Sequence, residues 1–466
     1  MNPFLNPKTG LPFVKDFLTV PGRLKKFSPK KMKKYRDKAF RKTVAYAYTV
    51  PLYYKKYKEA GIHPRDIRGI DDISKLPMIS KSDIVDHFPD GIIPKGYNDK
   101  TLQVVCTSGS TGKPVSFYVD FQTYATAAVI SIRELRFLNL HWRKSRFVHL
   151  GNYSTDKADI GFDKGLISKA QSIYSLDNYL QMNAFSPIQD VVKKLDEFQP
   201  DLINSYPITF QNLAYLKRKG YGKNINPKVI TVGGYVLDEY TKQYVEEAFG
   251  CQMLNTYGAA ESSANIAFEC RKGTWHINHD FFHIEAIDNK GEIVENGKRG
   301  HMLYTKMFGK GTPFIRYTGI DDWITIVPEY ECDCGLSTPI LTHGVEGRMS
   351  TSIVLPDGQL FPSASFATLS VVLNGLKTRK VKQFQIVQKK IDEIDILLVI
   401  DEDLRDEKPS MDILLKKIKE VYQKKVGPKV AINVREVKEI KSEPGKPSPL
   451  VISHVKPEEG FELLKL

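Results

Sequence analysis

Residues 104–115 read VVCTSGSTGKPV, and this stretch is the one around which the chain is organised. β-Branched and apolar residues flank it on both sides, so its Ser/Thr/Gly segment is predicted to be the tight turn of a hairpin. Glycines let a ligand approach the backbone, and N–H groups, hydroxyls and Lys113 favour an anion. It is not a Walker loop, because only two residues separate Gly109 from Gly112. The residues alone leave a phosphate-binding loop and an ordinary polar turn as alternatives.

Length and composition indicate a folded, globular chain of several domains. With 466 residues, 41% of them hydrophobic and 26% charged, the chain can bury a large core, and two to three domains are expected. No run approaches the ~18 apolar residues that a membrane span needs. The first residues, MNPFLN, lack the charged start and apolar block of a signal peptide. A cytoplasmic location is therefore expected.

The chain is basic, with a formal net charge of +14. Such a charge suits an anionic partner, whether a nucleotide, a nucleic acid or a membrane surface. The densest lysines lie in residues 25–42, where Ser28 and Pro29 are predicted to cap and begin a helix. Apolar residues recur there at helical spacing, which favours a solvated lysine face. No nucleic-acid fold signature accompanies the lysines, so no nucleic-acid partner is expected.

The order of predicted elements indicates an α/β fold. Residues 1–100 are mostly helical, whereas strands and helices alternate over residues 146–258. Residues 238–249 are a predicted helix that ends at Gly250. This alternation implies layered α/β structure with a largely parallel sheet, in which ligands gather at the carboxyl ends of the strands.

The second half of the chain changes character twice. Short strands and glycine turns over residues 275–326 predict a β-rich subdomain. After Arg348 the pattern becomes that of a small α+β unit. We therefore expect a large N-terminal domain, residues 1–347, and a small C-terminal domain, residues 348–466.

Several short motifs follow the predicted strands, and their order resembles that of the adenylate-forming superfamily of acyl-CoA synthetases and adenylation domains. The resemblance covers essentially the whole chain and is closest to the branch with phenylacetate CoA ligase and the capsule-biosynthesis CapK-like proteins. Alone, the motif YGAAE at 257–261 is a weak signal that also fits an ordinary turn, but its place in this order of motifs makes it a strong one. The resemblance implies ATP and Mg²⁺ as cofactors, CoA as a candidate acceptor, and a C-terminal domain that moves as a lid.

The resemblance also implies a role for each motif. The 107–113 loop would hold the β- and γ-phosphates of ATP, Tyr257 would lie near adenine, and Glu261 would hold Mg²⁺. The glycine turn at 233–235 would flank adenine and the acyl pocket. The nucleotide-site residues implied in this way are Thr107, Ser108, Gly109, Ser110, Thr111, Gly112, Lys113, Gly233, Gly234, Tyr235, Tyr257, Gly258, Ala259, Ala260, Glu261, Asp321 and Arg348.

Three positions depart from the family pattern. Gly and Ile are transposed before the ribose-binding aspartate, which leaves Asp321 and Asp322 both open for that role. Ser350 stands near the place of the usual hinge residue after Arg348. Lys446 resembles the catalytic lysine that bridges the carboxylate and the α-phosphate, with Lys113 holding the leaving phosphates, but Pro-Ser-Pro follows it.

A metal site is predicted among four residues of the β-rich region. Cys332 and Cys334 form a close pair before a glycine, and Cys270 and His276 lie upstream. Four such ligands would make a closed, structural zinc site, and members of the resembled branch carry a similar pair. The alternative is buried free thiols, and five cysteines are too few for a disulfide scaffold.

The predicted function is activation of a carboxylic acid by ATP. The expected products are acyl-AMP and pyrophosphate, and the acyl group then passes to CoA. Two alternatives stay open: transfer to a carrier protein or an amine in polysaccharide or natural-product biosynthesis, and a degenerate nucleotide-binding protein. Small residues beside Tyr206 and Tyr235 favour an aromatic acid. The oligomeric state, monomer or homodimer, is left open.

Overall fold

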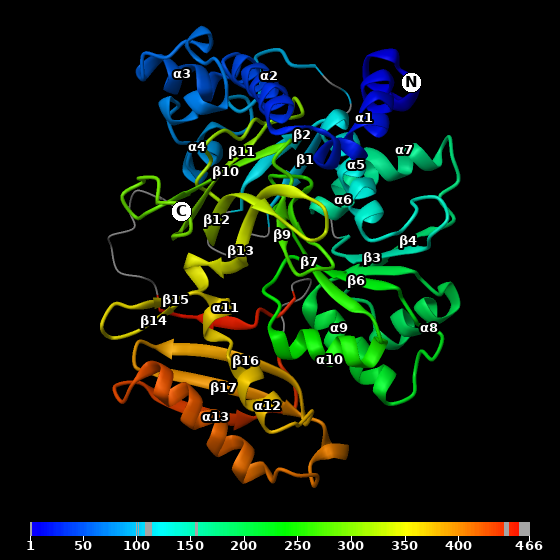
Figure 1. Ribbon diagram of the computed structural model, residues 1–466, viewed down its shortest axis with the longest axis vertical. Helices are drawn as coiled ribbons and strands as arrows, with labels where there is room; N and C mark the ends of the chain where they lie inside the picture. The colour runs from blue at the N-terminus through cyan, green and yellow to red at the C-terminus, as the bar shows by residue number, and fades with distance from the viewer. Residues whose placement is uncertain are drawn as a thin grey trace.

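A computed structural model describes residues 2–98, 100, 102–107, 114–153, 157–441 and 447–455. Figure 1 shows a large upper body that contains the N-terminal helices and the main sheet, and a smaller orange and red unit beneath it. This is the layered α/β architecture with a separate C-terminal α+β unit that the sequence predicts. None of the helices in the described residues is long and apolar enough to cross a membrane.

The first hundred residues are mostly helical, as predicted, and three of their four α-helices begin at a side-chain cap. The Asn6 and Ser28 side chains accept from the Lys8 and Lys31 amides at the starts of the first two long helices. Ser80 and Asp83 form a capping box at the fourth. These elements are η1 Pro3–Leu5, α1 Pro7–Lys26, α2 Pro29–Ala47, α3 Pro51–Glu59, η2 Pro64–Asp66, η3 Ile70–Lys75 and α4 Lys81–His87.

The predicted hairpin is present. Strands β1 Gln103–Cys106 and β2 Ser116–Val119 pair antiparallel, with Cys106 opposite Ser116. Beyond them, the Thr107 amide donates to the Val115 carbonyl at 2.9 Å. The turn residues 108–113 lie outside the described residues. The hairpin therefore holds the two ends of the predicted phosphate loop side by side.

One sheet of eleven strands organises the upper body, in the order β10-β11-β12-β13-β9-β8-β7-β6-β5-β3-β4. Strands β4, β3, β5, β6 and β7 are parallel, and the pairs from β7 through β8 to β10 are antiparallel. The strands are β3 Phe147–Gly151, β4 Tyr179–Asn183, β5 Leu202–Ser205, β6 Val229–Val232, β7 Gln252–Gly258, β8 Asn265–Glu269, β9 Trp275–Ile277, β10 Phe282–Ile287, β11 Arg299–Lys306, β12 Asp322–Glu331 and β13 Ser337–Arg348.

Helices cover the parallel half of this sheet. All four residues of β6 are buried, as expected of a strand covered on both faces. Helix α10 ends where predicted, because Gly250 takes the left-handed conformation with φ of +66°. The helices are α5 Phe121–Phe137, α6 Ala158–Phe162, η4 Asp163–Ile167, α7 Ser168–Gln171, α8 Ile188–Phe198, α9 Pro207–Arg218 and α10 Glu239–Phe249.

The C-terminal unit is a four-stranded sheet in the order β18-β17-β16-β19, and it packs on the parallel half. The Tyr240 hydroxyl on α10 donates to the Val381 carbonyl, and Arg379 pairs with Glu247. Its elements are η5 Met349–Thr351, β14 Ile353–Val354, β15 Leu360–Phe361, α11 Ser363–Phe366, α12 Leu369–Gly375, β16 Val381–Lys390, β17 Glu393–Ile400, η6 Glu402–Leu404, α13 Met411–Val426, β18 Ala431–Glu436 and β19 Val451–Ser453. The domain boundary at 347/348 stays a prediction.

A buried ion group joins three parts of the upper body. The Asp280 carboxylate, fully buried after β9, accepts from Arg23 of α1 at 3.0 Å and from Arg133 of α5 at 2.8 Å. Burial alone would raise the pKa of Asp280, but the two guanidinium groups hold that pKa below its ordinary value. The contact fixes α1 and α5 against the sheet.

Removing this carboxylate should strongly destabilise the protein. Asp280→Ala removes the ion-pair partner of the buried Arg133 and leaves the buried Arg23 with only Asp16, 4.0 Å away, so we expect a loss of about 3–5 kcal/mol in the free energy of unfolding. Chemical denaturation monitored by tryptophan fluorescence measures it. The control is Asp403→Ala, which breaks an exposed pair with Lys219 and should cost less than about 1 kcal/mol. Equal losses in the two variants would contradict the anchoring role.

Candidate functional site

The Tyr-Gly-x-x-Glu turn leaves β7, the strand where the parallel and antiparallel halves of the sheet meet. Gly258 is required there, because a Cβ atom would lie 2.9 Å from the Ala264 carbonyl oxygen. The Ser262 hydroxyl closes the turn by donating to the Ala259 carbonyl at 2.7 Å. Glu261 is thereby fixed in a buried position, with 6% of its surface exposed. A buried carboxylate of this kind suits a hard cation.

Two aspartates and an arginine lie beside this turn. The Tyr257 hydroxyl donates to Asp322 at 2.5 Å, and Arg348 Nε lies 3.9 Å from Asp321 Oδ1. Burial raises the pKa of Asp322, and Arg348 opposes that shift. Burial likewise raises the pKa of Glu261, opposed by its own backbone amide and by Arg348. The structure therefore brings together residues predicted from three motifs far apart in the chain.

The two aspartates differ in their partners. Asp321 pairs with Arg348 and accepts from the Ser350 amide at 3.3 Å, whereas Asp322 is held by Tyr257. Asp321 therefore lies on the side of the predicted hinge, and its contact with Arg348 joins two of the predicted nucleotide-site residues. The assignment of the ribose to Asp321 stays a prediction that this geometry favours.

The glycine turn after β6 lies next to the same strand end. At Gly233 a Cβ atom would lie 2.9 Å from the Thr256 carbonyl oxygen, and Gly234 has φ of +79° with Tyr206 packed against it. The Tyr206 and Tyr235 rings meet edge to face with centroids 6.0 Å apart, and Phe185 stacks on Tyr206 with centroids 6.2 Å apart. The predicted acyl pocket is therefore bordered by aromatic rings.

A group of polar side chains lies at the carboxyl end of β3, near these rings. The Tyr153 hydroxyl and His149 Nδ1 are 2.7 Å apart, and His149 Nε2 lies 4.0 Å from Asp159 Oδ1. Burial lowers the pKa of His149, which Asp159 opposes. Burial raises the pKa of Tyr206, and Asp159 adds to that shift. These side chains place hydrogen-bonding groups at the carboxyl end of the parallel sheet.

Two lysines near Glu261 were missed by the sequence reasoning. Lys306, on β11, is 4% exposed and donates to the Glu261 carbonyl at 3.2 Å. Burial lowers the pKa of Lys306 to about 8, opposed by Asp120 and Glu261. Lys81, at the start of α4, is also buried and is close enough to lower the pKa of Glu261. The one signal for Lys306 is its place at the end of an otherwise buried strand, where a lysine is rare.

The structure describes only some of the other residues predicted for the site. Thr107 is described at the edge of the hairpin, but Ser108, Gly109, Ser110, Thr111, Gly112, Lys113 and Lys446 lie outside the described residues. Residues 447–449, directly after Lys446, line a narrow crevice together with Tyr235 and Phe384. This crevice separates the glycine turn from the C-terminal sheet.

Outside the nucleotide site, the four predicted metal ligands converge. Cys270 follows β8, His276 lies on β9, and Cys332 and Cys334 occupy the turn between β12 and β13. Their four ligand atoms all lie within 4.8 Å of one another, with Cys334 Sγ 3.2 Å from His276 Nε2. The Thr338 hydroxyl contacts His276 Nδ1 at 2.8 Å and so orients the ring.

This cluster fits a tetrahedral metal site. Burial lowers the pKa of His276 to about 4, so its imidazole is neutral at pH 7, as a metal ligand must be. One pair of ligands comes from the β8–β9 hairpin and the other from the turn between β12 and β13, and one ion would join them. Such a closed site would stabilise the β-rich subdomain and leave no coordination position for a substrate.

Comparisons with known proteins place the chain among related sequences. Residues 363–453 match the family model described as the CapK C-terminal domain. The chain is 24% identical to the phenylacetate-coenzyme A ligase of Thermus thermophilus over 428 residues, which cover 87% of this chain and 92% of that protein. It is also 24% identical to the protein CapK of Staphylococcus aureus, over 83% of this chain and 81% of that protein.

The fold agrees with a solved structure as well. A 2-hydroxyisobutyryl-CoA ligase, in its postadenylation state with 2-HIB-AMP, superposes with a TM-score of 0.76 at 20% identity. The superposition covers 96% of this chain and 93% of the ligase. The predicted resemblance and the predicted fold class are both confirmed.

The cysteine and histidine cluster should bind zinc, and its loss should destabilise the protein. Protein purified without chelator should contain about one zinc per chain by elemental analysis. Cys334→Ser should lose the metal and lower the melting temperature, because a ligand and the link between two turns are removed. Falling pH should release the metal as the thiolates take up protons.

The matched control is Cys251→Ser, which changes another free cysteine outside the cluster. It should keep the zinc and the melting temperature of the parent protein. Metal-free protein from the first purification would overturn the assignment.

Proposed function

We propose that this chain, a homologue of the phenylacetate-coenzyme A ligases and of CapK with the fold of adenylate-forming enzymes, activates a carboxylic acid with ATP and passes the acyl group to CoA. In the first step a carboxylate oxygen attacks the α-phosphorus, the bond to the β-phosphate breaks, and pyrophosphate leaves. In the second, a thiolate attacks the acyl carbon and AMP leaves. The proposal rests on four residues that converge at the end of β7: Tyr257, Glu261, Asp321 and Arg348.

These residues suit a nucleotide with a bound cation. Asp321 can accept from ribose hydroxyls, and Tyr257 can lie against a purine while it donates to Asp322. Glu261 is the carboxylate fitted to hold Mg²⁺, which would neutralise charge on the phosphates. The chemistry then requires mainly positioning and electrostatic stabilisation. Lys113 and Lys446 are proposed, from the family resemblance, as the cations at the leaving phosphates and at the reacting carboxylate.

An aromatic acid is the proposed substrate class. Tyr206, Tyr235 and Phe185 border the space beyond the glycine turn and offer faces against which a flat ring can pack. His149 and Tyr153 lie near the same strand ends and can hydrogen-bond a polar substituent. We therefore favour a hydroxyl- or amino-substituted aromatic acid. The free state of all five cysteines fits the cytoplasmic location expected from the sequence.

A second kind of acceptor for the acyl group is considered beside CoA. Residues 363–453 match the CapK C-terminal domain, whose description names no acyl acceptor, so transfer to a carrier protein or an amine is kept beside transfer to CoA. Release of AMP that depends on added CoA would favour CoA. Acyl-AMP that forms but is not consumed by CoA would favour another acceptor.

Exchange of labelled pyrophosphate into ATP, with a panel of aromatic and aliphatic acids, tests the first step. We expect exchange with at least one aromatic acid. Lys446→Ala should slow it by roughly 10²-fold or more, because one electrostatic contact to the transition state is lost. Lys441→Ala, an exposed lysine at the start of the same loop, is the control and should keep the parent rate. No exchange with any acid would favour the degenerate alternative.

Lys306 should give the reaction an alkaline limit. It is charged below its pKa of about 8 and neutral above it, so its help in neutralising Glu261 and the phosphates is lost as pH rises through that value. We expect kcat/KM for ATP, which reports free-enzyme pKa values, to fall over this range. Lys306→Met should be about tenfold slower at neutral pH and lack this fall.

The exposed Lys298, just before β11, supplies the control. Lys298→Met should keep both the rate and the pH profile of the parent. An unchanged alkaline limb in Lys306→Met would assign that limb to another group.

A further inference from the structure

The positive charge of the chain is concentrated in its first two long helices. Residues 1–42 carry 13 lysines and arginines against two aspartates, a net +11 of the chain's formal +14. Every lysine in this segment is exposed, and Lys33 is ion-paired with Asp37 and Asp71. These exposed lysines are Lys8, Lys15, Lys25, Lys26, Lys30, Lys31, Lys33, Lys34, Lys38 and Lys42. None of this charge is used by the nucleotide site described above.

An apolar stripe runs along α1 beside its lysines. Leu11, Val14 and Leu18 are 67%, 51% and 73% exposed and recur at spacings of three and four, so they lie on one face of the helix. Lys8 and Lys15, seven residues apart, form a row next to that face. Single exposed apolar side chains are ordinary, but three on one helix face are not.

The opposite face of α1 is fixed to the protein. Val20 and Leu24 are buried, and Arg23 donates to the fully buried Asp280. The helix packs along α5, as Figure 1 shows, at the end of the molecule away from the C-terminal unit. The exposed stripe therefore lies on a helix whose opposite face is packed against the protein.

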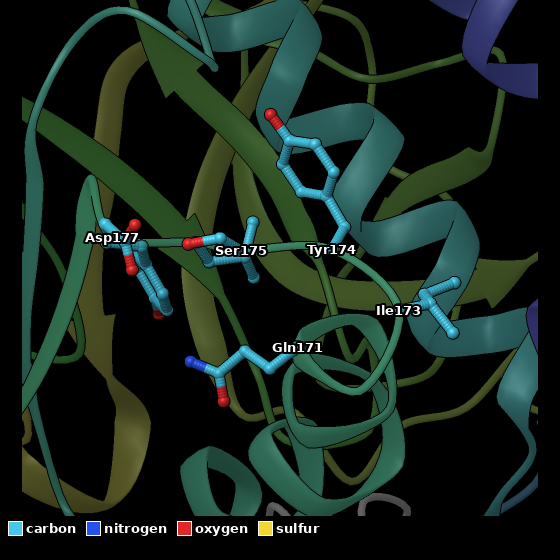
Figure 2. Close-up of a pocket in the computed structure, with 7 residues that line it drawn as sticks. Gln171, Ile173, Tyr174, Ser175 and Asp177 are labelled. Carbon is cyan, nitrogen blue, oxygen red and sulfur yellow. The ribbon is translucent and has the colours of Figure 1, made fainter.

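Aromatic side chains extend the surface beside α1. Phe17 of α1 meets Trp142 edge to face, and Trp142 in turn lies 6.2 Å from Tyr174. Ile173 and Tyr174 are 47% and 41% exposed, and Figure 2 shows them leaving the turn after α7, away from Gln171. Partly exposed tryptophan and tyrosine beside leucines and cations are typical of membrane interfaces.

We propose that α1 and the turn after α7 dock on an anionic membrane surface. The leucines would enter the headgroup region, the aromatic rings would lie at its edge, and the lysines would bind lipid phosphates. The positive charge of the lysines is complementary to the negative charge of the lipid phosphates, which favours a membrane as the partner of this surface. A second copy of the chain would bring two segments of net +11 together, which repel each other. A nucleic acid would match the lysines and leave the leucine stripe in water.

Flotation with lipid vesicles tests the proposal on the full chain. The protein should float with vesicles of equimolar phosphatidylcholine and phosphatidylglycerol and stay unbound with phosphatidylcholine alone. Binding should weaken between about 0.1 M and about 0.5 M salt, because salt screens the exposed lysines. Equal binding to both kinds of vesicle, or to neither, would overturn it.

Surface variants separate this face from a general charge effect. Changing Lys8, Lys15 and Lys26 to glutamine should weaken vesicle binding about fivefold for each lysine, or roughly a hundredfold together. Leu11→Ser with Leu18→Ser should weaken it at least about tenfold, because the inserted apolar surface is lost. All five side chains are exposed, so the melting temperature should not change.

Helix α13 of the C-terminal unit offers matched controls. Lys416, Lys419 and Lys424 are exposed, as is Ile413 at 50%. Changing the three lysines to glutamine, or Ile413 to serine, should leave vesicle binding at the parent level. Equal losses in the two sets of variants would overturn the assignment to α1. So would a dimer in solution that Leu11→Ser with Leu18→Ser dissociates, because a second copy would then cover the stripe.

Discussion

The position of the site depends on how β7 pairs with its two neighbours. On one side β7 lies parallel to β6, and on the other it lies antiparallel to β8. The carboxyl ends of the parallel strands therefore open beside strands that run the other way, and the chain must turn at the point where Glu261 stands. The antiparallel half then returns β12 and β13 to the same place, which brings Asp322 and Arg348 to Tyr257. Residues from distant motifs meet because of this one change of strand direction.

Electrostatics at this junction are set by burial. Glu261, Asp321 and Asp322 are all nearly inaccessible, and carboxylates so placed require nearby cations. Arg348, Lys306 and Lys81 supply part of that charge. A bound Mg²⁺ would supply more of this positive charge in the working enzyme. The site is thus arranged for charged ligands before they arrive, so little reorganisation is needed when charge moves between phosphates.

Features that depend on neighbouring residues could be predicted from the sequence, whereas features that depend on tertiary packing could not. Ser28 and Gly250 mark helix ends through hydrogen bonds made within a few residues, so their roles could be predicted from the sequence. The four metal ligands were predicted from residue type and a family resemblance. The sequence did not predict Lys306 and Lys81 as site residues, because a lysine is ordinarily a surface residue. Their burial results from tertiary packing alone. The different partners of Asp321 and Asp322 depend on the register of β12 and β13, which adjacent sequence does not encode.

Helix α1 has two faces with different roles. Its inner face carries Arg23 into the core, where Asp280 also holds Arg133, and its outer face carries leucines and lysines into solvent. The C-terminal unit packs instead on α9 and α10, at the other end of the large domain. A surface that attaches through α1 would therefore hold the large domain still and leave the C-terminal unit free to rotate. If the C-terminal unit moves as a lid, an attachment through α1 would not hinder it, because the two lie at opposite ends of the large domain.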